Sequence, residues 1–146
     1  MNNKIGQFDF PAFLMFSILR YFINYLWYSP MLFGDIWMQE NNIKPRQIEI
    51  LKNQGKMIEV YIWQFLLQSV SLFIHYQFLI YLQKELLDSI IFTCLLYIGF
   101  VIPTLYYSSI LDNNSFKLFS INAGYHLVSM IFFSVFIFMF EDLRGE

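Results

Sequence analysis

Seven polar side chains lie inside the most apolar parts of this chain and are candidate ligand-binding residues: Arg20, Asn24, Gln64, Gln68, His75, Asn122 and His126. One guanidinium, two imidazoles and four amides can hold a small polar or anionic ligand through charge and hydrogen bonds. The apolar segments contain no carboxylate pair, nucleophile motif, phosphate loop or zinc-protease motif. We therefore assign no catalytic residue, no metal and no cofactor, and we favour a non-enzymatic protein.

The candidate residues recur at steps of three, four or seven, which place them along one side of a helix. We call the facing polar stripes the polar seam. The predicted stripes are Ser17, Arg20, Asn24 and Tyr28; Gln64, Gln68, Ser71 and His75; Thr93, Tyr97, Thr104 and Ser108; and Asn122, His126 and Ser129. A polar group facing lipid is unfavourable, so we expect the stripes to face one another. Two interpretations follow: hydrogen bonds that only hold helices together, or an internal binding site.

Arg20 favours the binding site. It lies about ten residues, or some 15 Å, from either end of its segment, which is too deep for snorkelling. A guanidinium at this depth costs roughly 3 kcal/mol on insertion scales, and the apolar segments hold no carboxylate at its level. Water, a bound anion or another chain must compensate it.

Counting residues from the ends of the spans, at about 1.5 Å per residue, gives the depth of each side chain in the membrane. Arg20 and His75 then lie at one depth, and Asn24, Gln68 and His126 lie at a second depth. The two histidines then lie roughly 10 Å apart along the membrane normal. Histidine ligands of a metal must meet at about 2 Å. A haem held by both histidines is therefore not expected.

Four apolar segments must position these side chains. Three of them, Val60–Gln83, Ser89–Leu111 and Leu118–Phe140, run for 23 residues or more without a charge. About 20 residues suffice to cross the hydrocarbon core. The first segment is interrupted only by Arg20, and without a cleavage pattern it is expected to be a retained helix. The prediction is a single all-α domain over residues 1–146, an antiparallel four-helix transmembrane bundle with spans at about 10–28, 59–82, 88–110 and 118–140.

The connections follow from local signals. Ser29-Pro30 ends the first helix, and residues 31–43 mix apolar and acidic side chains, as expected of a segment lying at the membrane surface. Pro45 begins an amphipathic extension of the second helix, over about residues 45–58. Pro103 predicts a kink in the third span.

Composition excludes several classes of protein. The chain is 58% hydrophobic and 14% charged, against roughly 25% charged in soluble domains. Its net charge of −2 gives no support for nucleic-acid binding. Cys94 stands alone, so it forms no internal disulfide or thiol metal site. Five Lys and Arg residues on the side of loops one and three, against three on the other side, predict non-cytoplasmic N and C termini.

Two groups of motifs resemble a known family. They are Trp27-Tyr28-Ser29-Pro30, Leu32-Phe33-Gly34 and Trp37-Met38 in the first half, then Gly99-Phe100-Val101-Ile102-Pro103 and Ile121-Asn122-Ala123-Gly124-Tyr125-His126-Leu127. In this order they are similar to the signature of domain-of-unknown-function family 1761 (DUF1761). The resemblance covers most of the chain and implies a small, chiefly bacterial, integral membrane protein with four helices and no assigned activity.

The resemblance marks Trp27, Tyr28, Ser29, Pro30, Phe33, Gly34, Trp37, Asn122, Gly124, Tyr125 and His126. Arg20 is not part of the signature. A folding motif explains these residues at least as well as a binding site, because Trp and Tyr suit the interface and Gly124 allows close helix approach. The localisation expected is a bacterial inner membrane or an organelle membrane.

Three hypotheses for function remain. The first is a membrane protein whose seam binds or passes a small polar or anionic ligand, as a homodimer because four short helices barely enclose a pathway. The second is an accessory or assembly subunit of a larger membrane complex. The third and weakest is a membrane enzyme acting on a lipid or quinone. The bilayer is the one partner common to all three.

Overall fold

The computed structural model describes residues 9–82 and 85–145, and all regular structure in these ranges is helical. Three stretches of the described residues are long and apolar enough to cross a membrane: Lys56–Tyr81, Leu86–Leu111 and Phe116–Leu143. This confirms the all-α, membrane-type fold. Lys4 and Lys84, which enter the predicted orientation, lie outside the described residues.

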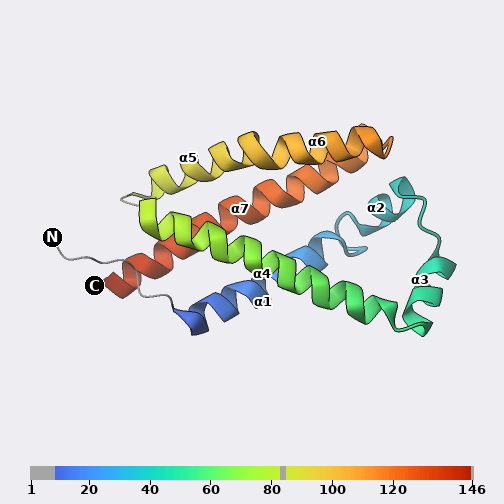
Figure 1. The fold of residues 1–146 in the computed structure, drawn as a ribbon, viewed down its shortest axis with the longest axis horizontal. Helices are drawn as coiled ribbons and strands as arrows, with labels where there is room; N and C mark the ends of the chain where they lie inside the picture. The colour runs from blue at the N-terminus through green and yellow to red at the C-terminus, as the bar shows by residue number, and fades with distance from the viewer. Residues whose placement is uncertain (1–8, 83–84, 146) are drawn as a thin grey trace.

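The central element is α7 (Phe116–Gly145). In Figure 1 it lies between α5–α6 on one side and α4 with α1 on the other. The bounds of these neighbours are α1 (Phe10–Trp27), α4 (Lys56–Leu82), α5 (Leu86–Leu96), η1 (Tyr97–Val101) and α6 (Ile102–Leu111). Consecutive long helices run in opposite directions across the view. α7 can therefore offer polar groups to two different sets of neighbours.

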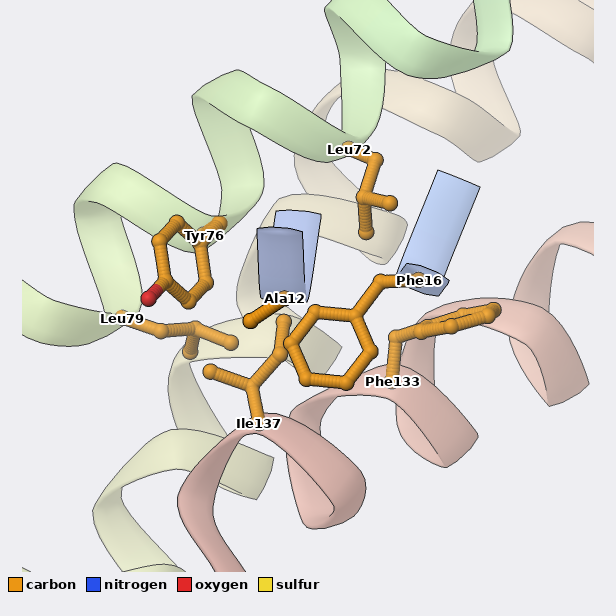
Figure 2. Close-up of a cluster of buried hydrophobic side chains, with 7 residues drawn as sticks. All are labelled: Ala12, Phe16, Leu72, Tyr76, Leu79, Phe133 and Ile137. Atoms are coloured by element: carbon orange, nitrogen blue, oxygen red, sulfur yellow. The ribbon is translucent and has the colours of Figure 1, made fainter. Parts of the chain in front are cut away.

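A cluster of buried apolar side chains joins α1, α4 and α7. Figure 2 shows its members, Ala12, Phe16, Leu72, Tyr76, Leu79, Phe133 and Ile137. The fully buried Phe16 ring lies edge-on to Phe136 at 5.6 Å and to Phe140 at 5.4 Å, between ring centroids. Close packing of this kind drives helix association where the surroundings are as apolar as the side chains. The cluster fixes the register of the three helices that carry the seam.

The first helix, α1, begins at a turn that is capped by a side chain. Its first turn contains Pro11, and the Ala12 amide donates to Asp9 Oδ1 at 3.0 Å. It has 18 residues, about 27 Å of helix, and it is not among the three stretches apolar enough to cross a membrane. The buried Arg20 and Asn24 interrupt its apolar character. A fourth span therefore stays a prediction.

The connection between α1 and α4 contains two short helices, α2 (Gly34–Glu40) and α3 (Pro45–Asn53). The expected continuous helix over residues 45–58 is divided, because α3 ends before Gln54 and α4 begins at Lys56. Gly55 has a φ of +71° and donates its amide to the Lys52 carbonyl at 3.1 Å. A left-handed glycine in this position ends a helix. The position of α2 relative to a membrane surface stays a prediction.

The third apolar stretch contains a π-helical turn, η1, next to the predicted kink at Pro103. Proline has no N–H to donate to the Gly99 carbonyl, and its ring crowds that carbonyl. The chain responds with a wider turn that contains one additional residue.

This additional residue corrects the predicted polar stripe on the third helix. Thr93 and Tyr97, before the wide turn, are buried as expected. Thr104 and Ser108, after it, are exposed, and the neighbouring Ser109 is buried instead. The stripe fails beyond Tyr97 because each residue after the π turn is rotated by one position relative to a regular α-helix.

Glu40, at the end of α2, connects this helix to the start of α7. The Ser115 hydroxyl donates to Glu40 Oε2 at 2.5 Å, and Lys117 Nζ lies 3.4 Å from Glu40 Oε1. The hydrogen bond from Ser115 is the main reason that the Glu40 pKa is lowered; desolvation opposes it, and Lys117 lowers the pKa further.

Replacing Ser115 by alanine is expected to raise the Glu40 pKa toward its ordinary value. Because the pKa is lowered in the folded state, the stabilisation is present above the unfolded-state pKa and is lost as the pH falls through the folded-state pKa. NMR titration of labelled glutamate carboxyls in micelles measures the difference. Ser120→Ala, an exposed serine on α7 that bonds only the Phe116 carbonyl, is the control. Identical Glu40 titrations in Ser115→Ala and wild type would contradict the assignment.

Candidate functional site

The motif residues at the end of α1 and the start of α7 are joined by two side-chain hydrogen bonds. Trp27 Nε1 donates to the Ile121 carbonyl at 3.2 Å, and the Tyr28 hydroxyl donates to Asn122 Oδ1 at 3.1 Å. A Cβ on Gly124 would lie 3.3 Å from the Trp27 indole, so the absence of a side chain at Gly124 leaves room for the indole. Asn122, a predicted binding residue, thus has a structural partner.

A tight turn follows α1 and depends on Ser29 and Gly34. The Ser29 hydroxyl donates to the Leu26 carbonyl at 2.7 Å, and the Gly34 amide donates to the Ser29 carbonyl at 2.9 Å. A Cβ on Gly34 would lie 2.4 Å from the Tyr28 carbonyl oxygen, so the turn has room only for glycine. Pro30 is exposed at the edge of this turn.

The aromatic motif residues pack around Tyr125. The Tyr125 ring centroid lies 5.6 Å from that of Tyr28 and 6.3 Å from that of Trp27. Phe33 lies 4.7 Å from Trp27, and Trp37 lies 5.6 Å from Tyr28. These contacts join α1, α2 and α7 in one aromatic cluster. Most of the motif residues therefore have a role in packing.

Polar residues of α1 and α4 meet in the predicted seam. Gln64 Nε2 donates to Asn24 Oδ1 at 2.6 Å. The residue count predicted that Gln68 would lie at the depth of Asn24, so the observed partner, Gln64, is one helical turn away from the predicted one. In antiparallel helices one turn back along α1 matches one turn forward along α4. This register brings Gln68 across from Arg20. Ser71, predicted on the same stripe, is exposed.

Arg20 is buried without an ionic partner in the described part of the chain. It is 4% exposed, and its guanidinium carbon lies 6.0 Å from the centre of the Phe133 ring. Its Nε–H has no hydrogen-bond partner, and no described carboxylate forms an ion pair with it. Contact with an aromatic face offsets only part of the desolvation of a buried cation.

Three further polar side chains lie within electrostatic reach of Arg20. They are the Tyr125 hydroxyl and the imidazoles of His75 and His126. The Tyr125 hydroxyl lies near enough to the Arg20 guanidinium to stabilise its charge, but the two groups do not reach the distance and angle of a full hydrogen bond. One cation from α1 therefore faces polar groups from α4 and α7, with no anion among the described side chains around it.

His75 is part of a buried hydrogen-bonded triad. Its Nε2 lies 3.0 Å from Thr93 Oγ1 and 3.3 Å from Ser134 Oγ, and the two hydroxyl oxygens are 2.6 Å apart. The triad joins α4, α5 and α7. Sequence reasoning identified His75 and Thr93 but missed Ser134, because Ser134 is rotated by about 80° from His126 on an α-helix of 3.6 residues per turn.

Six buried polar atoms of the described residues have no hydrogen-bond partner: Ser17 Oγ, Arg20 Nε, Gln68 Oε1, His75 Nδ1, Tyr125 OH and Ser129 Oγ. Five of these residues belong to the predicted seam, and the sixth is the motif tyrosine beside Arg20. Native structures leave few buried polar atoms unpaired. Their concentration on the facing sides of α1, α4 and α7 marks this region as the candidate site.

Two other features lie away from the seam. A groove of about 340 Å³ on α4 is lined by Phe73, Ile74, Gln77, Phe78 and Tyr81, none of which is a predicted binding residue. Within the described ranges, no group of His, Cys, Asp and Glu could hold a metal ion. The groove and the seam are therefore separate parts of the molecule.

Comparison with known proteins supports a single assignment. No curated protein matches the chain, and no solved structure matches it. A family model described as "Protein of unknown function (DUF1761)" matches residues 12–138, which include most of α1 and most of α7. The match covers the tight turn after α1, the aromatic cluster and the polar seam. The chain therefore belongs to the DUF1761 family of proteins of unknown function.

Proposed function

We propose that this protein is an integral membrane protein that binds a small anionic ligand in its polar seam, between α1, α4 and α7. In this proposal α1 is a fourth span, which completes an antiparallel four-helix bundle. Arg20 supplies the charge, while Gln68, His75, Tyr125 and His126 orient the ligand. Asn24, Gln64 and Asn122 support the site by holding the helices together.

The unpaired Arg20 guanidinium carries the proposal. A buried cation without a counterion is strongly unfavourable, and natural proteins retain such groups mainly for function. The unpartnered Tyr125 hydroxyl beside it can donate a hydrogen bond to an anion in addition to the charge of Arg20. Binding an anion there would neutralise the cation and satisfy donors that the chain leaves unpaired.

The burial of Arg20 favours a ligand over an accessory subunit. A carboxylate of a neighbouring chain would have to reach a guanidinium that is 4% exposed. A small ion that enters between the helices does not meet this obstacle. Purification in mild detergent separates the two, because an accessory subunit is expected to co-purify with larger partners.

The fourth span can be tested by thiol accessibility. In a Cys94→Ala background, single cysteines replace the exposed residues Pro11, Asp35 and Asp142. If α1 crosses the membrane, an impermeant maleimide labels Pro11→Cys and Asp142→Cys from the same side and Asp35→Cys from the opposite side. Labelling of Pro11→Cys and Asp35→Cys from one side would show that α1 does not span.

Anion binding can be tested with the full chain in nanodiscs. Isothermal titration with a panel of small carboxylates and phosphate is expected to find at least one that binds, and Arg20→Gln is expected to weaken it by about 100-fold or more. Arg46→Gln is the matched control, because Arg46 is exposed on α3. Binding that survives in folded Arg20→Gln would reject the proposal.

A further inference from the structure

The hydrogen-bonded triad fixes which nitrogen of His75 carries a proton. Ser134 Oγ donates to the Met130 carbonyl at 2.8 Å, which uses its one proton. Thr93 Oγ1, 2.6 Å away, must then be the donor toward Ser134 Oγ. His75 Nε2 faces both oxygens, at 3.0 and 3.3 Å, and neither has a proton left to give. Nε2 therefore carries the hydrogen and is the donor.

The other ring nitrogen of His75 is consequently a free hydrogen-bond acceptor. Nδ1 is buried and has no partner, and the residue is 5% exposed. A second proton on Nδ1 would place another buried positive charge within reach of Arg20, which is unfavourable. The neutral ring therefore keeps a lone pair available on the side away from Thr93.

A second free acceptor, Gln68 Oε1, belongs to the same helix. It is also buried and unpartnered, and the register set by the Asn24–Gln64 bond brings Gln68 opposite Arg20. Gln68 and His75 are seven residues apart, two turns on one side of α4. The seam thus combines a cationic donor, Arg20, with two acceptors that an aprotic anion would leave unpaired.

We infer that the ligand of the seam is a small carboxylate that also bears a hydroxyl or amino group, so that it offers a hydrogen-bond donor beside its anionic oxygens. This inference rests on the proposed function and specifies its ligand class. The carboxylate lies against Arg20, and the hydroxyl or amino hydrogen is donated to Gln68 Oε1 or His75 Nδ1. A plain carboxylate satisfies Arg20 but leaves both acceptors desolvated, which is the kind of mismatch that discriminates strongly against an analogue.

Glycolate and acetate provide a direct test, because they differ by one hydroxyl group. Binding of each to the full chain in nanodiscs is measured by isothermal titration. Wild type is expected to bind glycolate about tenfold more tightly than acetate, the effect of satisfying one buried acceptor. Gln68→Leu or His75→Phe, whichever removes the acceptor that is used, is expected to reduce the ratio of glycolate to acetate affinity to about twofold or less. Ser71→Ala, an exposed position on the same helix, should keep the full preference.

The outcomes separate this inference from the proposed function. Equal binding of glycolate and acetate by wild type overturns the inference and leaves anion binding at Arg20 standing. If wild type binds neither glycolate, acetate nor glycine, the inference is overturned too. If it also binds none of the other carboxylates or phosphate in the panel, the proposed function is rejected as well. The preference for glycolate can also remain unchanged in both Gln68→Leu and His75→Phe while these variants stay folded. In that case neither acceptor binds the ligand hydroxyl, and the inference is overturned as well.

Discussion

The Arg20→Met variant is expected to be more stable than wild type without ligand, by about 1–3 kcal/mol in the free energy of unfolding. Methionine has a similar length and no charge, so it keeps the packing against Phe133 and removes a buried cation that has no described ion-pair partner. Thermal unfolding in nanodiscs, followed by tryptophan fluorescence, measures the difference. A residue that lowers stability while it enables binding is a common compromise at functional sites.

The matched control for this variant is Arg46→Met. Arg46 is exposed on α3, and its replacement is expected to change stability by no more than about 0.5 kcal/mol. Marked destabilisation by Arg20→Met would mean that the folded chain already compensates the guanidinium. The principal argument for an anionic ligand would then be lost.

Gly34→Ala is expected to produce the largest loss of stability, about 3 kcal/mol or more. The new Cβ would lie 2.4 Å from the Tyr28 carbonyl oxygen and 2.6 Å from the Ser29 carbonyl carbon, both of which are backbone atoms. The turn must therefore open. Opening it is expected to displace Trp27 and Tyr28 from their hydrogen bonds with the start of α7. A lower midpoint of thermal unfolding and a red shift of tryptophan emission would report this change.

Gly99→Ala separates the steric effect from a general effect of replacing glycine. Beyond its chain neighbours and the backbone of its own helix, a Cβ at Gly99 would have no heavy atom within 4 Å. Alanine is favoured over glycine in helices by up to about 1 kcal/mol, so this variant is expected to be neutral or slightly stabilised. If Gly34→Ala and Gly99→Ala behave alike, the close backbone approach at Gly34 is not what the turn requires.

The apolar helices could be predicted from the sequence because their cause is local. Uninterrupted apolar stretches satisfy their backbone hydrogen bonds internally as helices, whatever lies beside them. The ends were equally local, since Ser29-Pro30 and Pro45 act on their own segments. Gly55 was the exception. It is counted in the pattern of an amphipathic helix, yet its φ of +71° ends α3.

The candidate site could be predicted only in part. On α1 the spacing of Ser17, Arg20 and Asn24 identified the buried side, because this helix is regular throughout. On the third helix the same reasoning failed at Ser108, since the π turn shifts the register. Ser134 was missed for another reason: a single stripe assumes one set of neighbours, and α7 has neighbours on two sides.

The sequence by itself determined that the chain forms apolar helices, that polar side chains share one side of α1, and that Arg20 lies far from both ends of its helix. These properties depend only on helical periodicity and on the order of residues. The tertiary structure decided which polar groups meet. It paired Asn24 with Gln64, placed Tyr125 and two imidazoles around Arg20, and left six buried polar atoms of the described residues unpartnered. Such pairings depend on how helices cross and on the π turn before Pro103, because packing between distant segments sets the register.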